Sequence, residues 1–215
     1  MFAVLTAAIA PGMALLSYFY LRHQYSQDIN GLVLRSFVIG AILVFPVMVL
    51  QYAFVVEGFF TDPISKSVIL YGFFEEFFKW FLLFFIVYQH AKFKRHYDGI
   101  IFGVAISLGF ASVENVFYLL AYGVETALGR ALLPVTSHSL FGVIMGYYLG
   151  KSKMESENKG SYLLLALLVP VALHSLYDLI LNLVSMYFLI AIIPFMILLW
   201  WFALHKVKLA NQLDR

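Results

Sequence analysis

The chain of 215 residues contains no cysteine, and only 12% of its residues are charged. Without cysteine, the protein has no disulfide bond, no thiol nucleophile and no thiolate ligand for a metal. An average soluble domain has about 25% charged residues, so this chain has roughly half the usual share. The formal net charge of +2 is too small to favour a nucleic-acid partner.

Apolar residues, in contrast, are abundant. They make up 63% of the chain, and the mean hydropathy is +0.89. A small soluble core cannot hide so much apolar surface, whereas a lipid bilayer can. Runs of about 20 apolar residues predict an all-α transmembrane bundle of about seven spans, at residues 2–21, 35–56, 66–89, 99–122, 131–150, 161–184 and 187–204.

The sequence between these spans contains no long linker, so residues 1–215 are expected to form a single membrane domain. The first span has no basic residue before Arg22. A signal peptide carries its positive charges ahead of the apolar stretch, so we expect this segment to be a retained helix. The last two spans are almost continuous, and a six-span bundle with a re-entrant segment is the alternative.

The basic residues of the loops predict the orientation of the bundle. Eleven Lys and Arg residues fall on one side, among them Arg22, Lys92 and Arg215, and only Lys66 and Arg130 fall on the other. Cytoplasmic loops of membrane proteins are enriched in Lys and Arg. We therefore expect the N-terminus outside and the C-terminus in the cytoplasm.

Ionisable residues interrupt the apolar sequence of the four middle spans. They are Glu75, Glu76 and Lys79 in the third span, Glu114 in the fourth, His138 in the fifth, and His174 and Asp178 in the sixth. A charged residue near the bilayer centre costs roughly 2.5–3.5 kcal/mol on insertion scales, and such residues usually face a bundle interior or a wet cavity. At 1.5 Å per residue, the four spans present these groups at depths of roughly 10–15 Å from the outer surface. The sequence therefore predicts one polar cluster in the outer half of the membrane.

Helical spacing predicts which of these residues lie on the same face of a helix. Residues four apart share a helix face, so Glu75 lies beside Lys79, and His174 lies beside Asp178. Glu75 and Glu76 diverge by about 100°, so one acid can face a reaction centre while the other orients a partner.

Two chemistries fit such a set. A carboxylate in a dry site can act as the general base for water, with a histidine that positions the water or stabilises the oxyanion. Alternatively, two histidines and a carboxylate can hold a catalytic zinc ion, for which the candidate ligands are His138, His174, Glu114 and Asp178. Spacing alone leaves the choice open.

Structural roles are the alternative for the same residues. The Glu75, Glu76 and Lys79 group can be an ion pair that fixes helix register, and His174 with Asp178 can be a self-satisfied pair. His138 begins a run of small residues every four positions, through Gly142 to Gly150, which is typical of close helix packing.

Three motifs lie on successive spans: Glu75-Glu76-x-x-Lys79, Phe110-x-x-x-Glu114 and His174-x-x-x-Asp178. Together they resemble the PrsW membrane proteases of Bacillus-type bacteria. The stretches at 9–20 and 97–99 are also similar to that family, so the resemblance covers essentially the whole chain. The pattern is more remotely similar to the type II CAAX-prenyl proteases, in which a histidine stands at the position of Glu114.

The resemblance implies a hydrolase of the bacterial cell membrane that makes the first, extracytoplasmic cut in a transmembrane anti-sigma factor during envelope stress. It also implies that Glu75 and Glu76 supply the general base and its orienting partner, with His174 assisting and with support from Lys79, Glu114, His138 and Asp178. Two other functions fit the buried acids and histidines. One is a proton-coupled transporter, and the other is a membrane sensor whose polar cluster only stabilises the bundle.

Overall fold

The computed structural model describes residues 2–23, 29–184 and 187–215. This part of the chain is helical and contains no strand. The long helices are α1 (Phe2–Leu21), α2 (Asn30–Val56), α5 (His96–Tyr122), α7 (Thr136–Met154), α8 (Lys159–Leu183) and α9 (Phe188–Leu213). Short elements complete two of the passes. They are α3 (Pro63–Ser65), η1 (Lys66–Phe73), α4 (Phe74–Leu82) and η2 (Leu83–Tyr88), and then η3 (Val124–Thr126), α6 (Ala127–Arg130) and η4 (Ala131–Val135).

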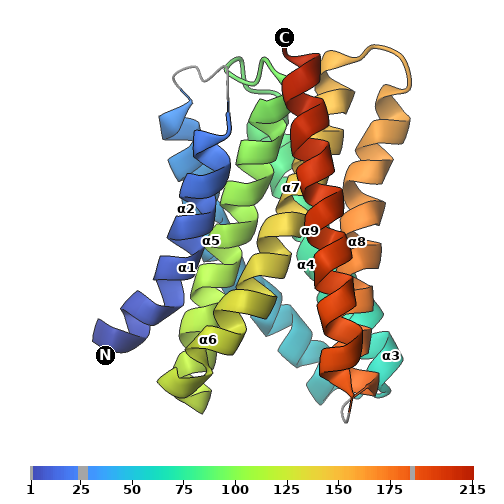
Figure 1. The fold of residues 1–215 in the computed structure, drawn as a ribbon. Coiled ribbons are helices and arrows are strands. Elements are labelled where there is room, and N and C mark those ends of the chain that lie inside the picture. Colours follow the sequence, from blue (N-terminus) through green and yellow to red (C-terminus); the bar gives the residue numbers. More distant parts are fainter. Residues whose placement is uncertain (1, 24–28, 185–186) are drawn as a thin grey trace.

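The helices run up and down as a membrane bundle, and the two chain ends lie at opposite ends of it (Figure 1). Among the residues that the structure describes, six helical segments are long and apolar enough to cross a bilayer. The third predicted span is the consecutive run from α3 to η2, in which α-helical and π-helical turns alternate. Both α8 and α9 are full-length apolar helices, so neither is a short re-entrant segment. The transmembrane bundle predicted from the sequence is confirmed.

Helices α5 and α7 form the centre of the bundle, and both are buried along most of their length. Glycines allow their backbones to touch. A Cβ atom at Gly103 of α5 would collide with the carbonyl of Gly142 of α7, and one at Gly146 would collide with that of Gly99. The glycine run after His138 is therefore a packing surface, and it fixes the face on which His138 lies.

A second close approach brings the third pass against α8. A Cβ atom at Gly72 would overlap the side chain of Ser175, so only glycine fits there. Gly72 lies just before the acids of α4, and Ser175 follows His174. The contact therefore places the first turn of α4 beside the histidine of α8. The π-helical η1 lies directly before this turn, and π-helical turns are frequent at functional sites.

Candidate metal centre and active site

Side chains from four helices converge on one cavity of about 230 Å³. Helix α4 contributes Glu75, α5 contributes Glu114, α7 contributes His138, and α8 contributes His174 and Asp178. The remaining lining residues are Tyr71, Arg130, Pro134, Tyr177, Leu181 and Asn182. Lys79 and Glu76 lie behind this lining and are fully buried. The structure thus brings all seven residues singled out in the sequence to one place.

Glu76 joins Lys79 to His174. Its Oε1 accepts a hydrogen bond from Lys79 Nζ at 2.7 Å and one from His174 Nδ1 at 3.0 Å. A carboxylate without a proton only accepts hydrogen bonds, so the proton of His174 is on Nδ1. The Nε2 atom of His174 then faces the cavity, 3.5 Å from Asp178 Oδ2. Glu76 has no exposed surface, so it orients the imidazole and does not reach the cavity itself.

His138 lies between a cation and an acid. Lys79 Nζ is 3.2 Å from its Nδ1, and Glu114 Oε2 is 3.2 Å from its Nε2. An ammonium group can only donate, so Nδ1 accepts, and Nε2 carries the proton that Glu114 accepts. The hydrogen bonds of both histidines are therefore directed by charged neighbours.

One carboxylate oxygen of Glu75 accepts a hydrogen bond, and the other accepts none from the described residues. Gln51 Nε2 donates to Oε1 at 3.2 Å. The buried Oε2 has no hydrogen-bond partner among the described residues, and the nitrogen atoms near it are Lys79 Nζ at 3.6 Å and His138 Nε2 at 4.0 Å. Asp178 Oδ2 is likewise buried without a hydrogen bond. Glu76 Oε2 also lacks a hydrogen bond, but Glu76 does not line the cavity. Among the described residues, Glu75 Oε2 and Asp178 Oδ2 are therefore the free carboxylate oxygens of the cavity lining.

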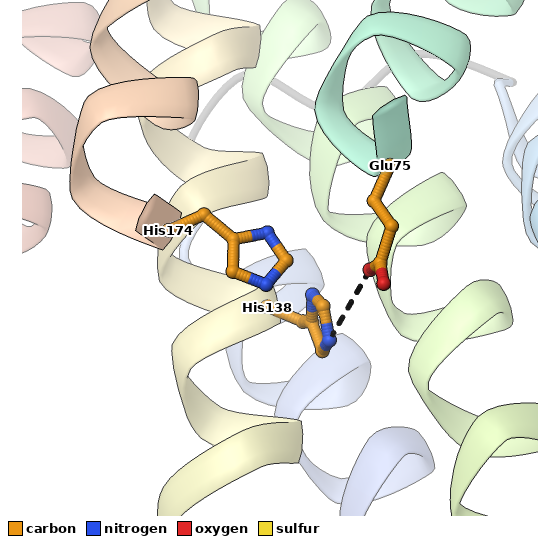
Figure 2. A group of neighbouring side chains, drawn as sticks. All are labelled: Glu75, His138 and His174. Atoms are coloured by element: carbon orange, nitrogen blue, oxygen red, sulfur yellow. Dashed lines mark ion pairs between the residues drawn. The ribbon is translucent and has the colours of Figure 1, made fainter. Parts of the chain in front are cut away.

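The carboxylate of Glu75 and the rings of His138 and His174 point toward one another (Figure 2). One possible ligand atom from each lies within 4.8 Å of the others. Two histidines and one carboxylate are a ligand set of catalytic zinc sites. The Glu76 carboxylate on Nδ1 of His174 matches the outer acid that commonly fixes a metal-binding imidazole. The donor set and the free oxygen of Glu75 therefore fit a metal ion.

His138 fits this role with one condition. To bind a metal through Nε2, its proton must sit on Nδ1, which now faces the Lys79 ammonium. Lys79 must therefore give up a proton or turn away when His138 becomes a ligand. Glu114 and Asp178, which the sequence also suggested as ligands, lie outside the three-residue group and each neighbour one histidine.

The contacts of these residues extend beyond the self-contained pairs. The acids of α4 do pair with Lys79, but Glu76 also holds His174, so it is not a spare acceptor. His174 uses Nδ1 for Glu76 and not for its helical neighbour Asp178. The cluster links four helices, whereas an ion pair that only set helix register would need two.

Sequence reasoning missed Arg130 as a member of the site, since it was counted only as a loop cation. Its Nη2 donates to Glu114 Oε1 at 3.0 Å, and its Nε donates to Asn115 Oδ1 at 2.8 Å. The guanidinium lies 4.0 Å from the ring centroid of Tyr118. The available signal was the Glu114-Asn115 pair, whose two acceptors match the two-pronged donor geometry of an arginine.

Comparison with known proteins identifies the family. Residues 28–203 match the model of the PrsW family intramembrane metalloprotease. The chain is 65% identical to Protease PrsW of Halalkalibacterium halodurans over the full length of both proteins. It is 49% identical to Protease PrsW of Bacillus subtilis, covering all of this chain and 98% of that protein. It is 31% identical to Protease PrsW of Clostridioides difficile over 90% of this chain and 86% of that protein.

No solved structure matches the chain. The family match covers most of the sequence, and the full-length relatives carry the same protease name. The six apolar helices agree with a multi-pass protein. The chain is therefore a membrane peptidase that belongs to the PrsW family.

Proposed function

We propose that this peptidase makes the first, extracytoplasmic cut in a transmembrane anti-sigma factor and so begins envelope-stress signalling. The observation that carries the proposal is the position of the polar cavity. Glu114 and Asp178 lie toward the ends of α5 and α8 that are far from the C-terminus of the chain (Figure 1). With the C-terminus in the cytoplasm, as the loop charges predict, the cavity belongs to the outer half of the membrane.

A surface hollow lies next to the cavity. This hollow, of about 180 Å³, is lined by Thr61, Pro63 and Lys66 and shares Tyr71 and Asn182 with the cavity. We infer that a substrate segment just outside the membrane approaches Glu75 from this side of the bundle. This geometry favours a cut next to the substrate's span over a cut at its middle.

The side chains of the site have different roles in hydrolysis. A zinc ion held by Glu75, His138 and His174 would supply Lewis-acid activation of water and of the peptide carbonyl. Glu76 keeps the proton of His174 on Nδ1. Before a metal binds, Glu114, held by Arg130, accepts the Nε2 proton of His138, and it would lose this hydrogen bond when Nε2 becomes a ligand. When water attacks the carbonyl carbon, a carboxylate takes its proton, which then passes to the leaving amine as the C–N bond breaks.

We infer from the free oxygens which carboxylate takes that proton. With Glu75 as a ligand, Asp178 Oδ2 is the remaining free acceptor that lines the cavity. Without a metal, Glu75 Oε2 itself serves as the base. Metal analysis separates the two chemistries. Stoichiometric zinc that is lost together with activity on chelation supports the ligand set, and full activity in metal-free protein supports Glu75 as the base.

The test is cleavage of a single-span anti-sigma factor by the purified protein in vesicles. Glu75→Gln should abolish cleavage, because it keeps the shape of the side chain and removes its charge. Glu57→Gln is the matched control, since it removes the same charge from an exposed residue. Mass spectrometry of the products should place the cut in the extracytoplasmic segment beside the span. A cut on the cytoplasmic side, or unchanged cleavage by Glu75→Gln, would overturn the proposal. Proton-coupled flux without proteolysis would instead support the transporter.

A further inference from the structure

The end of the bundle opposite the active site also carries a polar hollow. It lies where α1 and α9 end, close to the C-terminus (Figure 1), and its volume is about 550 Å³. Its lining residues are Leu21, the last residue of α1, then Arg22, and Leu204, Val207, Lys208, Asn211, Gln212 and Arg215 of α9 and its end. Volumes of 300–1,000 Å³ are usual for pockets that bind small ligands.

The α9 side of this hollow is one face of the helix, and this face changes from apolar to basic toward the end of the chain. Each of its residues has another one three or four positions away, so they share a face. The face begins with Leu204 and Val207, continues through Lys208, and ends with Arg215. A membrane lipid has the same order, with acyl chains below and a charged headgroup above. The gradient matches a lipid that lies along the helix.

The charged side chains that line the hollow all have the same sign. Arg22, Lys208 and Arg215 line it, and all three are exposed. In the part of the chain that the structure describes, none of these three cations forms an ion pair. No described acidic side chain lines the hollow. Three positive charges are therefore available to an anion.

Asp214 is the nearest acid in the sequence, but it is turned toward α5. Its Oδ1 accepts hydrogen bonds from the His96 backbone and ring at 2.8 Å, and its Oδ2 accepts from Tyr97 N at 2.9 Å. Burial alone would raise the pKa of Asp214, but the hydrogen bonds from His96 and Tyr97 lower this pKa below its usual value. The Asp214 carboxylate thus binds His96 and Tyr97 and does not pair with the cations of the hollow.

Two contacts hold the walls of the hollow in place. Asn211 Nδ2 donates to the carbonyl of Arg22 at 3.3 Å, which ties the end of α1 to α9. The guanidinium of Arg22 lies 4.6 Å from the ring centroid of Tyr18. Tyrosine is enriched at the membrane–water interface, so Tyr18 indicates that these cations lie at the level of lipid phosphates.

We propose that this hollow, between the ends of α1 and α9, binds the headgroup of an anionic phospholipid of the bilayer. The phosphate lies among Arg22, Lys208 and Arg215, and the first part of an acyl chain lies on Leu204 and Leu21. Basic pockets between membrane helices on the cytoplasmic side commonly bind anionic headgroups. This site is separate from the peptidase centre, and it does not depend on the proposed substrate.

The test is lipid binding to the full-length protein in detergent, measured by native mass spectrometry. Phosphatidylglycerol and phosphatidylcholine with the same acyl chains are the probes. The parent should bind one phosphatidylglycerol more tightly than phosphatidylcholine. Lys208→Gln with Arg215→Gln should weaken phosphatidylglycerol binding by roughly tenfold to thirtyfold, because each cation near a membrane surface contributes about a fivefold change. Arg215→Gln alone should weaken it about fivefold, which keeps the test available if the pair does not fold.

Arg35→Gln with Lys94→Gln is the matched control. These two residues are also exposed and belong to the same predicted side, but they do not line the hollow. The control pair should leave phosphatidylglycerol binding within about threefold of the parent. An equal loss in both pairs would show only diffuse surface charge and would overturn the site. Equal binding of the two lipids, or binding of soluble glycerol phosphate as tight as that of the lipid, would also overturn it.

Discussion

Replacement of Glu76 by glutamine separates an orienting role from a role in the reaction itself. In the structure Glu76 is fully buried and accepts hydrogen bonds from Lys79 and His174. The glutamine carbonyl can still accept a proton from one of these donors, but it carries no charge. Lys79 then keeps only Glu75 as a carboxylate neighbour, at 3.6 Å.

The size of the effect follows from these contacts. Removing one partner of a buried ion pair lowers the free energy of unfolding by about 3–5 kcal/mol. Because Glu75 remains as a partner of Lys79, we expect a loss at the lower end of this range, about 3 kcal/mol. For a protein of this length that is a decrease of roughly 6–12 °C in Tm. Loss of an outer carboxylate usually weakens metal binding 10- to 100-fold. We expect about tenfold, since the amide oxygen still accepts from His174 Nδ1.

The assay combines thermal unfolding in detergent with a titration against buffered zinc. Glu57→Gln serves as the exposed control and should change neither quantity. Unchanged Tm and zinc affinity in Glu76→Gln would refute the orienting role. So would a loss of activity of about 10⁴-fold with Tm and zinc affinity intact, because such a result would place Glu76 at the reacting atoms.

Three more predictions follow from single contacts. Arg130→Gln should lower kcat/KM about 10- to 100-fold with a small change in Tm, because the Glu114 side chain is partly exposed; Arg130→Lys, which loses the two-pronged contact, should restore little of the rate. Gly72→Leu should reduce both folding yield and activity, because any side chain there meets Ser175 of α8, and an unchanged Tm would contradict this packing. The pKa of Asp214 is lowered in the folded protein, so its ionised form stabilises the protein above the unfolded pKa of about 3.9. That stability is lost as pH falls through the lower folded pKa. The Tm of the parent should therefore decrease over this acid range, and the Tm of Asp214→Asn should lack this decrease.

Hydropathy predicted most of the fold. The run of apolar residues in α1 matches the predicted first span at both ends, because lipid exposure leaves a continuous signal. The third span was predicted as one helix, whereas it consists of α-helical and π-helical turns around α4. Such widened turns leave the composition unchanged, so no apolar pattern could reveal them. α9 extends to Leu213, beyond the predicted end at 204, because a helix continues into polar sequence after it leaves the membrane.

The members of the site could be chosen from the sequence because ionisable residues stand out in apolar spans. Their pairing could not, since it depends on how helices rotate against one another. Spacing placed His174 beside Asp178, yet the shorter contact is with Glu76 on another helix. Arg130 escaped notice because a cation outside a span has many ordinary roles, and its contact with Glu114 closes a separation of 16 residues.

Two hydrogen-bonded chains account for most of the charge in the site. Lys79, Glu76 and His174 form one, and Arg130, Glu114 and His138 form the other. A third contact, between Lys79 and His138, joins them. Each chain ends on an imidazole that lines the cavity. Glu75, whose ligand atom lies within 4.8 Å of one from each imidazole, has a carboxylate oxygen without a hydrogen bond, Oε2. Buried polar groups are normally satisfied, so this unpaired oxygen is the atom around which the catalytic chemistry should be sought.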